Sequence, residues 1–245
     1  MMVPGNDLTV YFGTSTQQPV FLKALIEEQF IDSCIPEQLV LTIVVAANVS
    51  LTLCDDLVQG AKQYRHALTF VVSEAALLTY TTQAVATLTQ VVDEAMLADE
   101  AIVEKDITVR LVGKLARATV VCCCYGSGQR VFRYTTRQEH CVEQTTSSVT
   151  VKGVVDHAAC FISKNMIAIS PEAQGCNAQQ VTKGILLSPQ AHALSIPQLE
   201  IQAHDVVCKH GAAISALSDE EMFYLQSRGI DAHKTRQILV QAFLD

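Results

Sequence analysis

The chain has 245 residues, of which 49% are hydrophobic and 17% are charged, and its formal net charge is −8 at pH 7. This composition excludes a disordered chain, because there is enough apolar material to bury a core. The basic residues are scattered, so no patch follows a phosphate backbone and we expect no nucleic-acid partner.

The N-terminal part gives few signals. Residues 1–13 have neither a basic region nor a long apolar run, so no secretory signal is expected. Residues 17–30 favour a short helix after Pro19, although their crowded apolar residues also permit a strand. The longest apolar run, near residues 39–49, is shorter than the ~20 residues that a membrane helix needs, so no membrane association is predicted.

From Leu39 onward, short runs rich in β-branched residues recur about every ten residues. They lie at 39–45, 49–53, 67–72, 77–82, 85–92, 107–113, 119–124, 131–136 and 148–155. A sandwich, a barrel or a solenoid can be built from such a series. Hairpin dipeptides such as Asn-Gly are missing, while Thr-rich strands with small residues suit stacked coils.

The nine cysteines are an odd number without the spacing of a disulfide scaffold. They predict reduced thiols and a cytoplasmic protein. Strand alternation should put Cys122 and Cys124 on one face and Cys123 on the other. Because adjacent strand residues point apart and no Cys-x-x-Cys pair exists, we interpret this triplet as small core residues.

The stretch from Leu199 to His210 alternates as one extended strand, with one side buried. His204, Cys208 and His210 fall on the other side. Cys208 and His210 are two residues apart, or roughly 6–7 Å, so both can reach one soft metal or cluster. The spacing alone favours a plainer interpretation, a buried thiol beside a satisfied histidine.

Helix signals follow. Ser218 and Glu221 form a capping box that predicts a helix from about Asp219 to Ser227, and Gly229 is placed to end it. Asp231 can then cap a second helix that runs to about Phe243. Its buried stripe is predicted to comprise Ile238, Leu239, Ala242 and Phe243.

Three segments, at residues 197–201, 205–212 and 223–230, resemble the C-terminal region of the SufB/SufD family of the Suf iron–sulfur cluster assembly system, most closely its SufD branch. The resemblance is clear over the last hundred residues or so and weaker before them. It implies a mainly β fold, a right-handed parallel β-helix over residues 35–212 with a small C-terminal helical segment over 213–245. Residues 1–34 would be a short N-terminal segment, where family members usually carry a long helical region.

The resemblance also implies a function. The chain would be a non-catalytic scaffold subunit that pairs with a SufB-like subunit through its last β-helix strands and binds a SufC-like ATPase through its C-terminal helices. His210 matches the family histidine proposed to ligate a transient iron–sulfur cluster shared with SufB, and Cys208 matches the cysteine beside it. The ATPase contacts would be Phe223, Tyr224, Leu225, Arg228, Ile238 and Phe243. The common nucleotide and hydrolase motifs are missing, which favours a protein without catalytic activity of its own.

Alternatives remain at this point. SufB is disfavoured because Thr182 stands near the place of its scaffold cysteine and Gly211 stands where SufB-like chains carry a Glu. A free strand edge could also pair with a second copy of the chain. A different class is an independent metal-binding or carbohydrate-active β-solenoid, for which acidic pairs are expected on one face. The candidates are Asp55 with Asp56, Asp93 with Glu94, and Asp99 with Glu100.

Overall fold

The computed structural model describes residues 7–27, 38–55, 63–84 and 101–245. Its strands form two seven-stranded parallel sheets, called sheet A and sheet B. Sheet A consists of β1 (Asp7–Phe12), β3 (Gln38–Val45), β5 (Gln63–Val72), β7 (Ile102–Leu111), β9 (Val131–His140), β11 (Cys160–Ile169) and β13 (His192–Ile201). Sheet B consists of β2 (Val20–Phe21), β4 (Ser50–Asp55), β6 (Leu77–Ala84), β8 (Arg117–Gly126), β10 (Thr146–Val155), β12 (Cys176–Leu186) and β14 (Val206–Ala216).

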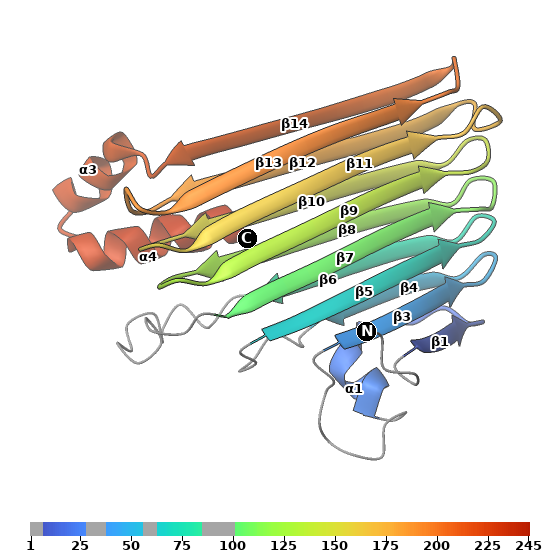
Figure 1. Cartoon of the computed structure of the whole chain (residues 1–245), viewed down its shortest axis with the longest axis horizontal. Helices are drawn as coiled ribbons and strands as arrows, with labels where there is room; N and C mark the ends of the chain where they lie inside the picture. Colours follow the sequence, from blue (N-terminus) through green and yellow to red (C-terminus); the bar gives the residue numbers. More distant parts are fainter. Residues whose placement is uncertain (1–6, 28–37, 56–62, 85–100) are drawn as a thin grey trace.

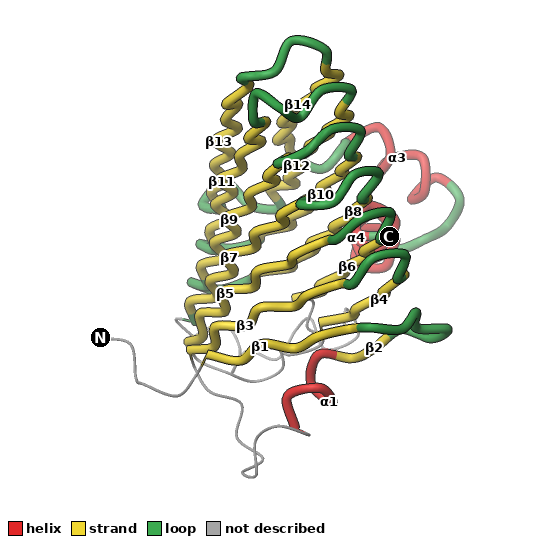
Figure 2. Tube along the Cα trace, turned by 90° about the vertical axis from the view of Figure 1, so that its right-hand side faces the viewer, coloured by secondary structure: helices red, strands yellow, loops and turns green. Residues whose placement is uncertain are grey.

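The chain alternates between the two sheets, so each coil adds one strand to each (Figure 1). The coils rise from β1 and β2 at one end to β13 and β14 at the other, with a right-handed turn. Figure 2 shows the two sheets facing each other across a narrow interior, called the lumen here. The predicted right-handed parallel β-helix is therefore confirmed. Eight of the nine predicted strand runs match strands, and the run at 85–92 lies outside the described residues.

The apolar core fills the lumen. Along each strand every second side chain points inward, as in β3, whose burial alternates residue by residue. Because neighbouring strands are parallel and in register, like residues stack: Leu41, Leu68 and Ile107 occupy equivalent positions and are at most 1% exposed. Removing this apolar surface from water is the main driving force for stacking the coils.

The turns from sheet A to sheet B also stack. Five successive turns each hold one residue with positive φ: Asn48, Ala75, Leu115, Gln144 and Gly175. Backbone hydrogen bonds link one turn to the next, for example from the Gln144 N–H to the Gln174 carbonyl oxygen at 2.8 Å. These turns carry the chain across to the other sheet instead of reversing it beside its own strand. That is why the sequence lacks the hairpin dipeptides.

The first coil lies before the predicted boundary at residue 35. β1 pairs with β3, and β2 pairs with β4, so this part of the N-terminal segment belongs to the β-helix. Helix α1 (Leu22–Glu27) follows β2 directly and packs Leu22 and Ile26 against the main core. Residues 17–30 thus contain both a short strand and a short helix, and residues 28–30 lie outside the described part.

The cysteine triplet on β8 divides between two faces, as predicted. Cys122 and Cys124 point into the lumen and belong to the main core, whereas Cys123 points outward into a separate apolar cluster. Burial raises the pKa of all three thiols, so they stay protonated at neutral pH. All three are therefore small core residues, and every described cysteine is a free thiol.

Two helices follow β14. Helix α3 (Asp219–Ser227) begins after Ser218, whose hydroxyl accepts a hydrogen bond from the Glu221 N–H, and Gly229 follows it with φ 86°. Helix α4 (Ala232–Leu244) begins after Asp231, whose carboxylate accepts from the Lys234 N–H. Both helices and their caps were predicted.

The predicted buried stripe of α4 is wrong, because Ile238 and Ala242 are exposed and Leu239 and Phe243 are only half-buried. The fully buried residues are Thr235, Val240 and Leu244, whereas Ile238 is 37% exposed. Val240 and Leu244 pack on the outer face of sheet B, in the cluster that contains Cys123. The face that α4 turns to sheet B therefore contains Val240 and Leu244 in place of Ile238 and Ala242.

The lumen also holds a buried ion pair. Lys105 Nζ lies 2.6 Å from Asp55 Oδ2 and 2.5 Å from Thr82 Oγ1, and the Tyr80 hydroxyl donates to the same Asp55 oxygen at 2.6 Å. Both charged side chains are fully buried. The pair joins β4, β6 and β7 across the lumen, so it fixes the register of three strands.

A second cluster of buried polar side chains surrounds His140. Its Nδ1 lies 2.7 Å from Thr145 Oγ1 and its Nε2 lies 2.8 Å from Ser147 Oγ, while the Ser147 hydroxyl donates to Gln138 Oε1. Ser147 must therefore accept from Nε2–H. In a neutral ring Nδ1 then accepts from the Thr145 hydroxyl, which lies closer to Nδ1 than to another acceptor, the Val142 carbonyl oxygen at 3.2 Å. This arrangement suits a neutral imidazole, and burial lowers the pKa of His140 to about 4.

His140 should make stability depend on pH. In the unfolded chain it binds a proton below about pH 6.5, whereas in the folded chain it stays neutral until about pH 4. The unfolded state binds more protons between these values, so the contribution is complete above pH 6.5 and is lost as the pH falls toward 4. We expect about 3 kcal/mol of the free energy of unfolding to be lost over this range.

Urea unfolding between pH 7 and pH 4 measures this loss. His140→Gln should remove this part of the pH dependence, whereas the exposed control His157→Gln should keep it. An unchanged pH dependence in His140→Gln would contradict the assignment.

Candidate functional site

The C-terminal end of the β-helix is open. β13 and β14 are the last strands of their sheets, and no described strand pairs with their outer edges (Figure 2). Apolar side chains are exposed there. Leu199 and Ile201 on β13 are 42% and 40% exposed, and Val207 on β14 is 52% exposed. Exposed strand edges with apolar side chains are surfaces on which another chain can pair.

Cys208 and His210 both lie on β14. In register, Cys208 lies beside Ala178 and His210 beside Gln180 on β12, and those two neighbours are buried in the lumen. Cys208 and His210 therefore share the lumen-facing side of the open strand. Cys208 is half-buried against Ala178, and this burial raises the pKa of its thiol, whereas His210 is exposed. A metal bound by Cys208 would displace the thiol proton.

The alternation predicted one strand from Leu199 to His210, and this prediction is wrong. β13 ends at Ile201, a turn follows, and β14 begins at Val206 in the other sheet. Ala203 in this turn is buried, but the inward positions change from odd-numbered residues on β13, such as Ile201, to even-numbered residues on β14. Cys208 and His210 therefore lie on the inward side of their strand, and not on the side away from the core as the alternation predicted. His204 lies exposed in the turn, where its N–H donates to Gln174 Oε1 at 3.2 Å. It is separated from Cys208 and His210 by the bend.

The backbone groups at the open edge can be assigned. Asn177 on β12 donates its N–H back to Thr145, on the side of β10. Val207 is in register with Asn177 and therefore points its N–H back to β12. Successive residues of a strand point their N–H groups to alternate sides. The groups that face the open edge are consequently those of Cys208, His210, Ala212 and Ile214.

The edge of β13 is interrupted. His192 donates its N–H back to Ala159, beside β11. By the same alternation, Pro197 falls on the side that faces the open edge, where a missing N–H breaks no bond to β11. β14 contains no proline, so its edge offers the unbroken row of donors and acceptors.

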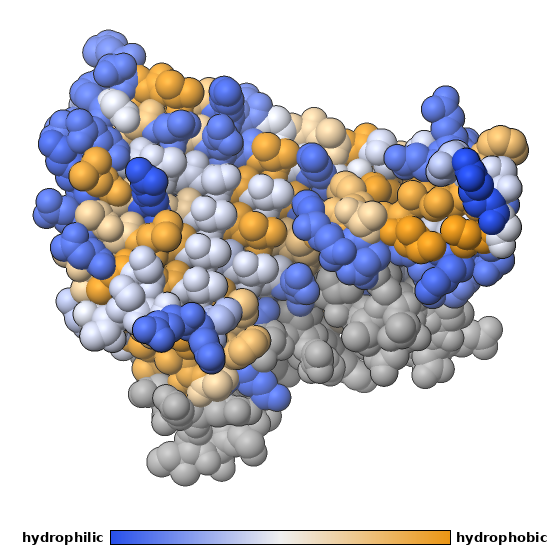
Figure 3. All heavy atoms as spheres, turned by 180° about the vertical axis from the view of Figure 1, so that it is seen from behind, coloured by the Kyte–Doolittle hydropathy of each residue, from blue (hydrophilic) through white to orange (hydrophobic). Residues whose placement is uncertain are grey.

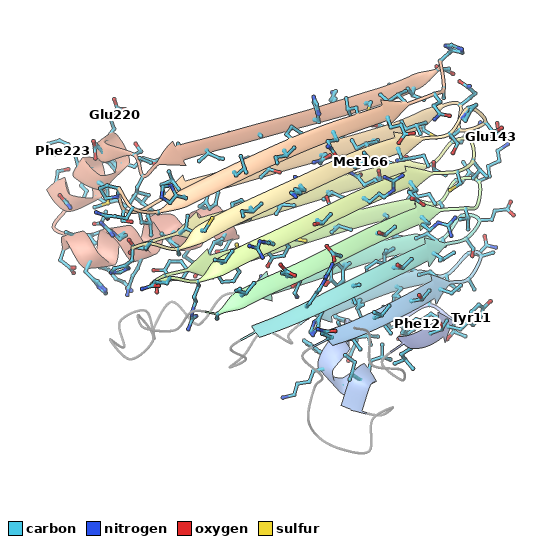
Figure 4. The ribbon with its side chains drawn as sticks, in the orientation of Figure 1. Tyr11, Phe12, Glu143, Met166, Glu220 and Phe223 are labelled. Carbon is cyan, nitrogen blue, oxygen red and sulfur yellow. The ribbon has the colours of Figure 1, made fainter. Side chains whose placement is uncertain are left out.

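The helices carry the other predicted contact residues. No residue of α3 is buried, and Phe223 and Tyr224 are 73% and 57% exposed. Figure 4 shows Phe223 and Glu220 projecting from α3 away from the β-helix. The Arg228 guanidinium lies 5.2 Å from the centre of the Tyr224 ring, and Leu225 is half-buried.

The residues predicted to contact an ATPase differ in how exposed they are. Phe243 on α4 packs against the cluster under the helix, with Lys152 Nζ 6.0 Å from its ring centre. Ile238 is exposed. Viewed from behind, apolar surface gathers at the helical end of the molecule (Figure 3).

The acidic pairs expected of a carbohydrate-active solenoid do not gather in the described part of the chain. Asp55 is buried in the ion pair with Lys105, and the pairs Asp93 with Glu94 and Asp99 with Glu100 lie outside the described residues. Within the described ranges, no group of three or more histidine, cysteine or acidic side chains could hold a metal ion. No described helix is long and apolar enough to span a membrane.

The family profile described as "SUF system FeS cluster assembly, SufBD core domain" matches residues 36–243. The chain belongs to the SufBD core domain family. Family proteins of this kind are components of iron–sulfur cluster assembly. The matched region contains every described strand from β3 onward, all of α3, and α4 except for its last residue.

Individual SufBD relatives align with only part of this chain and with a smaller part of their own length. The chain is 39% identical over 92 residues to a SufBD family protein of Synechocystis, which covers 38% of this chain and 20% of the relative. It is 34% identical over 92 residues to SufD of Escherichia coli, covering 38% and 22% of the two chains. SufD of Bacillus subtilis is 27% identical over 119 residues, covering 49% and 27%. The chain thus spans about a quarter of the length of these relatives.

Proposed function

We propose that this chain is a SufD-like, non-catalytic scaffold subunit that pairs with a SufB-like subunit through β14. The observation that carries the proposal is that the two predicted ligands, Cys208 and His210, both lie on the strand with the open edge. A partner strand added to this edge would come directly beside them.

The incomplete ligand set supports a shared site. Cys208 and His210 supply one soft sulfur and one imidazole nitrogen, both suitable iron ligands. In the described part of the chain no third candidate joins them. A nascent iron–sulfur cluster, the cargo of the assembly, would therefore take its remaining ligands from the paired subunit.

The exposed side of α3 is proposed to bind a SufC-like ATPase. Phe223 and Tyr224 leave large aromatic surfaces in solvent, with Arg228 beside them. Aromatic and arginine side chains dominate the energetics of protein interfaces. Leu225, Ile238 and Phe243 belong to the same proposed contact region. ATP hydrolysis would be the task of this partner, and a cytoplasmic location is part of the same proposal.

Anaerobic loading of the co-purified complex with Fe²⁺ and sulfide tests the ligand assignment. His210→Ala and Cys208→Ala should each reduce bound cluster iron at least about tenfold while the complex stays intact, because one ligand of a shared site is lost. His204→Ala is the matched control, since His204 lies exposed in the turn, and it should load like the wild type. Normal loading in both ligand variants would leave the chain an architectural subunit.

Failure of the purified chain to bind either a SufB-like or a SufC-like partner would contradict the proposal more broadly. Pairing only with a second copy of itself would be one such outcome.

A further inference from the structure

The side-chain oxygen of Gln180 is buried and has no hydrogen-bond partner within the described residues. Gln180 lies on β12 and is 1% exposed. Its register neighbour on the open side is His210, and on the other side it is Val149. Gln180 thus lies directly under His210, on the same lumen-facing side of sheet B.

The residue that faces Gln180 across the lumen in the same coil is apolar. The Asn165 amide donates to Thr182 Oγ1 at 2.8 Å, which aligns these two positions of β11 and β12 across the lumen. Because β11 and β12 run in opposite directions, two residues further along β11 and two residues back along β12 bring Ile167 opposite Gln180. Ile167 is fully buried and apolar.

Some other inward polar groups at this end bond to one another, although Gln138 Nε2 and Ser195 Oγ also lack a partner within the described residues. Thr136 donates to Asn165 Oδ1 at 2.8 Å, and the Asn165 amide also donates to Ser163 at 2.7 Å. Burying an amide among apolar residues without a partner is unfavourable. Of the three unpartnered groups, the Gln180 acceptor is the one whose register neighbour on the open strand is a histidine, so it points to His210 as its partner.

We propose that Gln180 is a positioning residue for His210, and that its amide oxygen accepts the ring N–H that His210 does not use toward the metal. Neighbouring strands lie about 4.8 Å apart and both side chains share one side, so rotation of the side-chain torsions brings the amide and the imidazole together. The His210 ring makes no other hydrogen bond to the described part of the chain, so nothing else there holds it.

The chemical reason is general. A histidine that ligates a metal almost always donates its second ring N–H to an oxygen acceptor, which fixes its tautomer and orientation. His210 sits on an edge strand and is exposed, so it needs such an acceptor more than a histidine packed in a core. The inference rests on the proposed role of His210 as a cluster ligand.

The test compares Gln180→Leu, which removes the acceptor at similar size, with Gln180→Glu, which keeps an oxygen acceptor. Both are made in the complex with the SufB-like subunit and loaded anaerobically with Fe²⁺ and sulfide. The rate at which a chelator removes the iron should rise about 10- to 100-fold in Gln180→Leu. Gln180→Glu should retain iron substantially better than Gln180→Leu.

Two further measurements separate positioning from a structural role. Leucine suits the apolar lumen, so Gln180→Leu should unfold in urea at the same or a higher midpoint than the wild type although it holds iron less tightly. In a His210→Ala background, Gln180→Leu should cause no additional loss, because its effect passes through His210. Gln180→Met gives the same comparison if leucine packs poorly.

The outcomes distinguish this inference from the proposed function. Loss of iron in His210→Ala with wild-type retention in Gln180→Leu would overturn the role of Gln180 alone. Wild-type retention in both variants would overturn both. An equal loss from Gln180→Leu in the wild-type and His210→Ala backgrounds would also overturn it, since Gln180 would then act independently of His210.

Discussion

Ala212→Pro should abolish stable pairing with a SufB-like subunit and leave the β-helix folded. The Ala212 N–H faces the open edge of β14, so proline removes no bond between β14 and β12. It does remove a donor from the middle of the edge, and its ring occupies the space that a partner strand would enter. An acceptor left unpaired at the interface costs about 1–3 kcal/mol, which corresponds to roughly 5- to 150-fold in affinity before any clash.

Ala212→Val is the matched control for this change. It enlarges the side chain but keeps the edge N–H, and the valine would face the lumen beside Thr182, which is buried at this level. Binding measured by titration calorimetry should be retained in Ala212→Val and lost in Ala212→Pro, with both variants showing the circular dichroism of the wild type. Equal binding by both would mean that the partner does not add a strand to β14.

Lys105→Met should lower the free energy of unfolding by about 3–5 kcal/mol. Methionine fills a similar volume, but Asp55 would keep a buried carboxylate without the cation that now lies 2.6 Å away. The Tyr80 hydroxyl bonds the same oxygen and cannot neutralise it. A cost of this size is a large fraction of the stability of a typical domain.

Two controls isolate the buried charge. Lys183→Met changes an exposed lysine on β12 and should alter the urea midpoint little. Lys105→Met combined with Asp55→Asn removes both charges and should recover much of the lost stability, because no uncompensated ion remains buried. A single Lys105→Met variant as stable as the wild type would show that the pair does not hold β4, β6 and β7 together.

Local patterns in the sequence predicted the regular parts of the fold well. The β-branched runs of the described strands, the opposite faces of Cys122 and Cys123, and the capped start of α3 at Ser218 all depend on neighbours in the chain. The choice of a parallel β-helix required the family resemblance, because alternation is the same in any half-buried strand. The first coil, with β1 and β2, was missed because the N-terminal strands are short and lack a strong apolar run.

The corner between β13 and β14 could not be recognised from the sequence. Alternation places Leu199 and His210 on opposite sides of one strand, whereas in the structure both are inward positions, because the inward parity changes at this corner between the two sheets. Cys208 and His210 nevertheless lie on one strand, β14, and their role as ligands stays a prediction. Gln180 was missed since an inward glutamine carries no motif. Its only signal is a polar residue at an inward position of an alternating strand, and its partner is thirty residues away in sequence.

Amide hydrogen exchange of β14, followed by NMR for the chain alone and with a SufB-like subunit, tests the central claim most directly. Pairing at the open edge should slow exchange of the edge-facing amides of Cys208, His210, Ala212 and Ile214, whereas the amides between them, already bonded to β12, should change little. Slowed exchange confined to α3, with the edge-facing amides of β14 unchanged, would contradict the proposal that β14 is the pairing strand.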